Sequence, residues 1–104
     1  MISLLLIYSA IFTPNKDNNT CSVSFPDLNY SCLLDYSDKE TFRKQLQDEL
    51  GFALWLLEDS GKLIPTPKTI SKNSLPAGSF IDFVQCDYFK FKKTISVKVF
   101  DLSV

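Results

Sequence analysis

The fold is decided by the stretch Cys21-Ser22-Val23-Ser24-Phe25-Pro26-Asp27-Leu28. Val23 and Phe25 alternate with serines, a pattern that predicts a strand with one buried face. Pro26 ends this strand, because proline cannot donate a hydrogen bond to a ladder and restricts the residue before it. Asp27 then favours a turn, and Leu28 gives the chain a reason to return to the core.

The residues on either side extend this strand into a three-stranded antiparallel meander. Residues 7–12 are rich in β-forming side chains and predict a first strand. The turn formers of residues 13–19 then predict a hairpin leading into the strand that Pro26 ends. Residues 30–34 predict a third strand, and short connections between successive strands favour a meander.

One long helix follows, predicted over residues 38–60. Ser37 and Glu40 have the spacing of a capping box at its start. Gly61 supplies a stop signal, and the prolines that follow forbid continuation. The apolar positions with helical spacing predict a stripe that packs on the sheet: Phe42, Leu46, Leu50, Ala53 and Leu57.

The second half of this helix is apolar on every side, from residue 52 to residue 57. Phe52 and Trp55 lie off the sheet-facing stripe. A helix that is apolar all round has to be covered on more than one face. We therefore expect Phe52 and Trp55 to contact either the C-terminal part of the chain or a second copy of it.

The C-terminal part predicts two further strands. The centre of residues 80–86 is Phe83-Val84, which indicates a strand buried on both faces. Residues 87–93 are a charged and aromatic connection, and residues 94–100 alternate as a fifth strand. The predicted fold class is therefore α+β, with a small antiparallel sheet of three to four strands, one long helix packed on it in the order β-β-β-α-β, and a C-terminal strand.

Charge is distributed unevenly along the chain. Residues 1–61 carry nine acidic and four basic residues, whereas residues 62–104 carry seven lysines and three aspartates. An acidic body favours a basic protein partner and repels nucleic acid. The three cysteines have no metal-binding spacing, and we interpret them as reduced thiols of a cytoplasmic protein. The apolar run at residues 1–12 is too short to span a bilayer and lacks the charged start of a signal peptide.

Composition argues against catalysis. The chain contains no histidine, which removes the commonest general base and every Ser/His or Cys/His arrangement. Its three glycines are isolated, so no phosphate-binding loop is present. We expect no catalytic residue, no metal and no cofactor. The alternative is a magnesium-dependent nuclease built from carboxylates near strand ends, namely Asp17, Asp27, Asp35 and Asp82.

Four runs, in this order, carry a family resemblance: Tyr8-Ser9-Ala10-Ile11-Phe12-Thr13-Pro14; Ser22-Val23-Ser24-Phe25-Pro26-Asp27-Leu28; Leu56-Leu57-Glu58-Asp59-Ser60-Gly61; and Ile64-Pro65-Thr66-Pro67. Together they resemble the HicB-type antitoxins over about residues 7–68, and more loosely over 80–100. The resemblance implies a partial RNase H-like domain at residues 1–87. In that family the domain binds and blocks a small basic mRNA-cleaving toxin, HicA, whose catalytic residue is a histidine.

The chain departs from the family pattern at two places. Residues 29–32 replace the Pro-Gly-Cys that often follows Phe-Pro-Asp-Leu, which predicts a different turn. Many relatives also carry a C-terminal ribbon-helix-helix or helix-turn-helix module that binds the promoter. Here residues 88–104 predict a ribbon-like strand without the two helices, and we interpret them as the remnant of a dimerisation element.

That strand has a polar and an apolar face. Its polar face offers DNA-contact candidates Thr94, Ser96 and Lys98. Without helices to clamp the phosphates, we expect specific DNA binding to be weak or absent. DNA binding through Lys92, Lys93 and Lys98 stays an alternative. The more favourable use of the strand is pairing with a second copy, for which the dimer-contact candidates are Phe52, Trp55, Ile95, Val97 and Val99.

The sequence therefore predicts an antitoxin-like protein that neutralises a small HicA-like toxin by direct binding. The acidic candidates for that contact are Asp27, Asp35, Asp48 and Glu49. The expected assembly is a homodimer or a higher homo-oligomer, with no membrane contact. The alternative is an orphan or truncated HicB-like dimeric regulator, such as one carried by a phage, that has no toxin partner.

Overall fold

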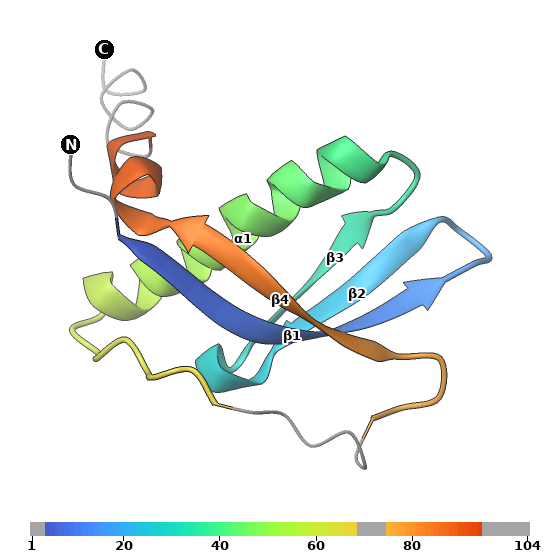
Figure 1. Cartoon of the computed structure of the whole chain (residues 1–104), viewed down its shortest axis with the longest axis horizontal. Helices are drawn as coiled ribbons and strands as arrows, with labels where there is room; N and C mark the ends of the chain where they lie inside the picture. Colours follow the sequence, from blue (N-terminus) through green and yellow to red (C-terminus); the bar gives the residue numbers. More distant parts are fainter. Residues whose placement is uncertain (1–3, 69–74, 95–104) are drawn as a thin grey trace.

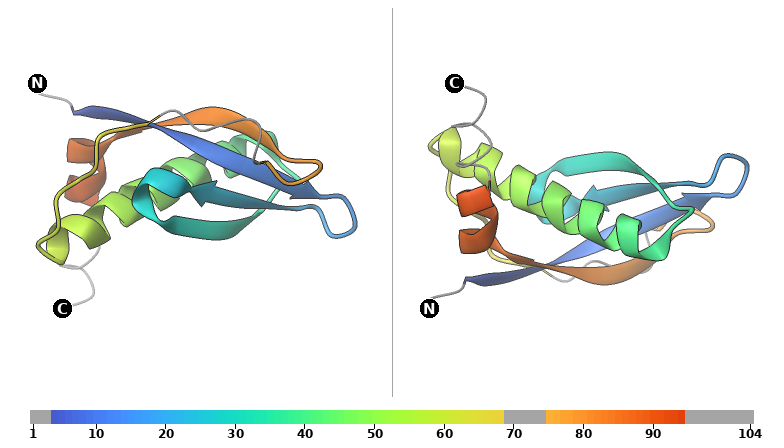
Figure 2. Two further views of the ribbon diagram at one scale, coloured as in Figure 1. Left: turned by 90° about the horizontal axis from the view of Figure 1, so that it is seen from below. Right: turned by 90° about the horizontal axis from the view of Figure 1, so that it is seen from above.

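The computed structural model describes residues 4–68 and 75–94. Its elements are β1 (Leu5–Asn15), β2 (Thr20–Phe25), a 3-10 helix η1 (Pro26–Leu28), β3 (Tyr30–Asp35), α1 (Lys39–Asp59) and β4 (Phe80–Asp87). The strands form one antiparallel sheet in the order β3-β2-β1-β4, and α1 lies across one face of it (Figures 1 and 2). The predicted α+β fold, with one long helix on a small antiparallel sheet, is confirmed.

The Phe-Pro-Asp-Leu stretch behaves as its chemistry requires. Phe25 is fully buried at the end of β2, and Pro26 is the first residue of η1. Asn29 then adopts a left-handed conformation with φ 50°, and its N–H donates to the Pro26 carbonyl at 3.2 Å. Asparagine tolerates this conformation better than most residues, which lets the chain reverse into β3 within one residue.

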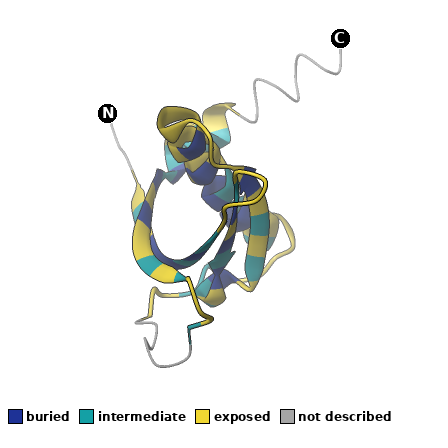
Figure 3. Ribbon diagram, turned by 90° about the vertical axis from the view of Figure 1, so that its right-hand side faces the viewer, coloured by how far each residue is buried: buried dark blue, intermediate teal, exposed yellow. Residues whose placement is uncertain are grey.

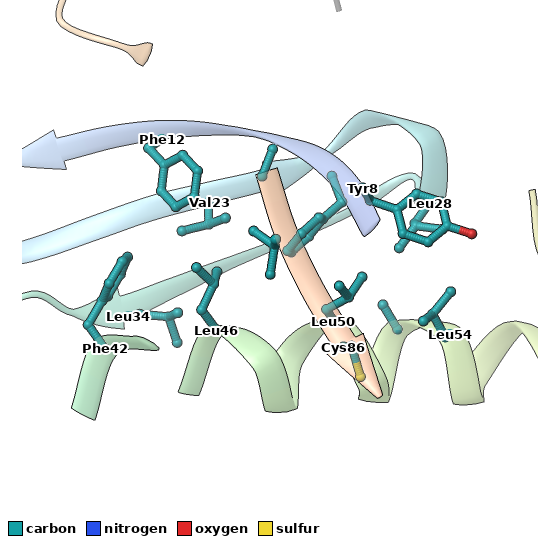
Figure 4. Packing of buried hydrophobic residues seen from close by; sticks show 14 of the residues in the cluster. Tyr8, Phe12, Val23, Leu28, Leu34, Phe42, Leu46, Leu50, Leu54 and Cys86 are labelled. Atoms are coloured by element: carbon teal, nitrogen blue, oxygen red, sulfur yellow. The ribbon is translucent and has the colours of Figure 1, made fainter. Parts of the chain in front are cut away.

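The core lies between the sheet and α1. Alternate residues of β1 point toward the helix, and the apolar stripe of α1 points back at them (Figure 4). Burial of each large apolar side chain here contributes about 1.5–3 kcal/mol. The fully buried members with the largest side chains are Tyr8, Tyr88, Phe25, Leu50, Leu54, Val23 and Cys21.

The start of α1 corrects one prediction. Asp38, not Ser37, is the N-cap, because its carboxylate accepts the Thr41 N–H at 3.0 Å. Ser37 is held by the preceding strand end instead, where its N–H donates to Asp35 Oδ1 at 2.8 Å. The bonds from Thr41 also hold the pKa of Asp38 below its usual value.

The segment after β4 corrects a second prediction. Residues 88–94 are helical, whereas the sequence predicted a charged and aromatic connection over residues 87–93 and a C-terminal strand within residues 88–104. The segment packs on α1, because the ring of Phe91 sits against the bare backbone of Gly51. Lys92 Nζ also lies 3.1 Å from Glu58 Oε1. Thr94 therefore belongs to a helix, and the rest of the strand expected at 94–100 lies outside the described residues.

The burial of β4 corrects a third prediction. Val84 faces α1 and is buried, but Phe83 points to the opposite face and is 70% exposed. The reason is topological: β4 is an edge strand, and among the described residues no helix covers the outer face of the sheet (Figure 3). The sequence pattern Phe-Val is the same for a strand buried on both faces and for an edge strand with an uncovered apolar side chain.

We predict that Gly51→Ala destabilises the protein. A Cβ at position 51 would overlap the Phe91 ring, so the ring or the helix must shift. We expect a loss of about 1–3 kcal/mol in the free energy of unfolding, measured by urea denaturation.

A matched control isolates this contact. In a Phe91→Ala background the space is open, so Gly51→Ala should instead stabilise α1 by up to about 1 kcal/mol, the difference in helix propensity. Destabilisation of equal size in both backgrounds would contradict the packing of residues 88–94 on α1.

Candidate protein-binding site

Three of the four predicted acidic residues converge on one groove. Asp35 ends β3, Glu49 lies on the flank of α1 that faces β3, and Asp48 lies on the outer face of α1 and lines grooves on both sides. These residues, with Leu33, Leu34 and Gln45, line a groove of about 350 Å³ that we call the acidic groove. Lysine and arginine are absent from this lining in the described part of the chain. Asp48 also lines a neighbouring groove that contains Asp87 and Lys90. The lining of the acidic groove itself carries negative charge only, which suits basic side chains.

Hydrogen bonds hold two of these carboxylates in place. The Tyr30 hydroxyl donates to Glu49 Oε2, which ties β3 to the middle of α1. The pKa of Tyr30 is raised by burial and by the nearby Glu49 carboxylate. Ser37 donates to Asp35 through its hydroxyl and its N–H, and these bonds lower the pKa of the Asp35 carboxyl. Asp35 therefore remains ionised at neutral pH.

The free edge of β3 borders the acidic groove. Tyr36 donates its N–H to Asn19 O at 2.7 Å, and the β2–β3 register continues from that pair without a break. Because backbone groups alternate along an antiparallel pair, Ser31, Leu33 and Asp35 direct their N–H and C=O groups away from β2. Leu33 is also 66% exposed. An unpaired strand edge therefore lies beside the carboxylates.

Exposed apolar side chains continue the groove along α1. Phe52 and Leu56 follow Asp48 and Glu49 at helical spacing, and both are exposed. The Phe52 and Trp55 rings stack with centroids 6.0 Å apart. The prediction that Phe52 and Trp55 are dimer contacts stays a prediction; Ile95, Val97 and Val99 lie outside the described residues.

The fourth predicted residue, Asp27, has a different role. Its Oδ2 accepts the backbone N–H of Lys68 at 2.8 Å, and it does not line the acidic groove. The neighbouring Tyr8 hydroxyl donates to the Pro65 carbonyl at 2.6 Å. Together these bonds fix the extended segment after α1 against the end of the sheet. The structure thus places Asp27 in an internal contact.

Sequence reasoning missed Tyr30 and Leu33 as members of this site. Neither carries a signal of its own, because a tyrosine or leucine on a strand usually packs in the core. The alternation within β3 places Leu33 on the face opposite Leu34. What was missing is the strand order, which makes β3 an edge.

The residues of the two alternative functions are not brought together. Asp35 and Asp82 lie on strands at opposite edges of the sheet, and Asp17 lies in the β1–β2 turn. Within residues 4–68 and 75–94, no group of three or more Cys, Asp or Glu side chains could hold a metal ion. Of the DNA-contact candidates, Thr94 is helical, while Ser96 and Lys98 lie outside the described residues.

The three cysteines are free thiols, two of them buried and Cys32 half-buried. Burial raises the pKa of Cys32 and of Cys86 to about 11, with nearby carboxylates adding to the effect. These thiols are therefore protonated and poorly nucleophilic at neutral pH. In the described part of the chain, α1 and the other helical residues include no segment long and apolar enough to cross a membrane.

Comparison with known proteins adds one structural likeness. No known protein family matches the chain, and no curated protein sequence does. Among solved structures, a chain of a toxin-antitoxin complex from Streptococcus pneumoniae is similar, with a TM-score of 0.65 and 22% identity. The match covers 85% of this chain and 73% of that one. The two chains share a fold.

We predict that Tyr30→Phe lowers the free energy of unfolding at neutral pH by about 1 kcal/mol, because the Glu49 carboxylate loses its hydrogen-bond donor at a partly exposed site. The folded-state pKa of Tyr30 is raised, so its contribution is complete below pH of about 10 and is lost as pH rises further. The variant should therefore lose less stability than the parent between about pH 9.5 and 11 in urea titrations.

Tyr36→Phe is the control, because the Tyr36 hydroxyl forms no hydrogen bond with a carboxylate within the described residues. It should leave the free energy of unfolding at pH 7 unchanged. If both variants lose the same stability at pH 7, the Tyr30–Glu49 bond does not hold β3 to α1.

Proposed function

We propose that this chain is an antitoxin-like binding module whose acidic groove holds a small basic ribonuclease. The observation that carries the proposal is the convergence of Asp35, Asp48 and Glu49 on one groove beside a free strand edge. The acidic charge of residues 1–61 predicted a basic partner, and the groove gathers that charge at one place.

The structural likeness supports the same role. A chain with this fold forms part of a toxin-antitoxin complex in Streptococcus pneumoniae. The finer proposal, a HicB-like antitoxin acting on a HicA-like toxin in the cytoplasm, rests on the sequence runs that end at Leu28 and at Pro67.

Neutralisation follows because this chain competes with RNA for the basic surface of the toxin. A protein that cleaves RNA needs a basic surface, because contacts with phosphates supply much of its affinity for nucleic acid. The three carboxylates of the acidic groove compete for that surface. Phe52 and Leu56 add apolar contact next to the charges, which supplies affinity that salt does not screen. We propose that the chain itself catalyses nothing and acts by covering the toxin.

The same apolar residues leave a second candidate, a dimeric regulator without a toxin. The stack of the exposed Phe52 on the half-buried Trp55 is the observation that favours it, because aromatic side chains are enriched in protein interfaces. The two candidates differ in what the acidic groove does. If the chain is such a regulator, removal of the charges of the acidic groove has no effect on the binding of any ribonuclease.

The test is co-expression with the short reading frame beside this gene, if it encodes a small basic protein. We expect the chain to restore growth and to co-purify with the toxin. Asp35→Asn combined with Asp48→Asn should weaken binding at least about tenfold, measured by calorimetry at two salt concentrations. Glu49 is left intact because it also bonds Tyr30.

The matched control is Asp17→Asn combined with Asp59→Asn. It changes the net charge equally, but neither residue lines the acidic groove. This control should bind like the parent. Failure to form a complex would contradict the antitoxin role, and equal losses in both double variants would contradict the role of the acidic groove.

A further inference from the structure

The outer edge of β4 is open. β4 ends the strand order β3-β2-β1-β4, and only its other side is bonded to β1 within the described residues. Tyr88 donates its N–H to Leu4 O at 2.9 Å, and the β1–β4 register runs on from this pair without a break. Because the bonding direction alternates, Ile81, Phe83 and Gln85 direct their N–H and C=O groups outward. The Phe83 N–H donates to the carboxylate of Asp82 at 2.8 Å, which agrees with this geometry.

Large apolar side chains are exposed beside this edge. Phe83 stands at the centre of β4, on the face of the sheet away from α1. On the neighbouring strand β1, Leu5 is 54% exposed and Ile7 is 45% exposed, and both lie on that same face by register. An eight-residue open edge flanked by exposed apolar residues is a surface that pairs with another chain.

The opposite side of the edge opens into a second groove. It lies between β4 and the N-terminal half of α1 and has a volume of about 510 Å³. We call it the β4 groove. Phe80, which is exposed, stacks on Phe12 in its wall with centroids 5.1 Å apart. Its charged residues have both signs: Lys39, Arg43 and Asp82.

We propose that β4 pairs antiparallel with β4 of a second copy, around a two-fold axis that passes midway between the two Phe83 residues. A two-fold axis perpendicular to a sheet makes neighbouring strands antiparallel and puts equivalent residues opposite each other. Phe83 then exchanges both backbone bonds with Phe83 of the second copy. The two sheets join into one of eight strands, and the two α1 helices lie on the same face.

The charges of the β4 groove favour a second copy over a foreign partner. Within the described residues the ion pair formed is Lys92 with Glu58, so Asp82, Lys39 and Arg43 have none. A strongly basic segment would be repelled by the two cations, and an acidic one by Asp82. A second copy brings its own Asp82 alongside Arg43 and Lys39, and does so twice by symmetry.

Asp82 gives the proposal its sharpest test. A charged residue that points inward on an edge strand is also a known means of preventing edge pairing. In the single chain its carboxylate occupies the Phe83 N–H. Pairing replaces that contact with a backbone carbonyl and frees Asp82 for the cations. Asp82→Ala therefore weakens a dimer that uses this pairing, whereas it would strengthen association if Asp82 guarded the edge.

The dimer is independent of the proposed function, but it has a consequence for it. β3 lies at the far end of each half of the joined sheet, so both acidic grooves stay open. One dimer would then bind two basic partners.

The experiment is sedimentation velocity of the full chain between about 1 and 100 µM, with circular dichroism to check folding. We expect a dimer. Phe83→Lys and Gln85→Pro should each raise its dissociation constant at least about tenfold, because they place like charges at the axis or remove an outward N–H. Leu33→Lys and Leu33→Pro make the same changes on the opposite edge and should leave the dimer intact.

A cross-link locates the axis. Equivalent residues at the axis have Cα atoms about 5.5 Å apart, with Cβ atoms too widely spaced for an unstrained disulfide but within reach of a short bifunctional thiol reagent. With such a reagent, Phe83→Cys should therefore form a covalent dimer, and Leu33→Cys should not. Four results would each overturn the proposal: a monomeric parent chain, no Phe83→Cys dimer, a dimer dissolved by Phe52→Lys but not by Phe83→Lys, or tighter association of Asp82→Ala.

Discussion

Every other part of the structure depends on β1 being paired on both sides. It is hydrogen bonded to β2 along its C-terminal part and to β4 along most of its length. β2 arrives through a tight turn, but β4 arrives after α1 and a long connection. The attachment of β4 therefore carries the larger entropic cost of loop closure. The alternation of β1 offsets this cost, because Tyr8, Ala10 and Phe12 together bury the face on which α1 rests.

Because α1 crosses a sheet with two open edges, its two flanks lie beside different strands. The flank near β3 carries Glu49, whereas the flank near β4 carries Lys39 and Arg43, and Asp48 lines a groove on each side. A single helix thus separates a negative groove from one of mixed sign. The two proposed surfaces, one for a basic partner and one for a second copy of the chain, therefore do not overlap.

Local chemistry in the sequence was enough to place most elements. The alternation around Val23 predicted β2, Pro26 predicted its end, and the apolar stripe through Leu46 and Leu50 predicted α1. The structure has all three. The prediction that Ser37 caps α1 was wrong because two neighbouring residues, Ser37 and Asp38, could both cap it. The choice depends on Asp35, whose carboxylate accepts the Ser37 N–H and holds Ser37 in the preceding turn. The helix at residues 88–94 was not predicted, because seven residues hold too little periodicity to reveal a helix that is stabilised by packing.

The candidate site shows the same limit. Acidic composition predicted a basic partner, and three of the four chosen acidic residues line one groove. Asp27 does not line it, because its position after Pro26 places its carboxylate where it accepts the backbone N–H of Lys68. Leu33 and Phe83 could not be recognised from their own strands. Whether an outward side chain is covered depends on strand order, which is a property of the whole sheet.

The contact between the Phe91 ring and Gly51 links two parts of the chain that are far apart in sequence. Phe91 fills the space that any other residue at position 51 would need. Neither position can therefore change freely during evolution while the other stays the same. Among sequences that share this fold, a larger residue at the position of Gly51 should appear together with a smaller one at that of Phe91. Such paired substitutions would record, in sequence alone, which relatives dock their C-terminal segment on the helix in this way.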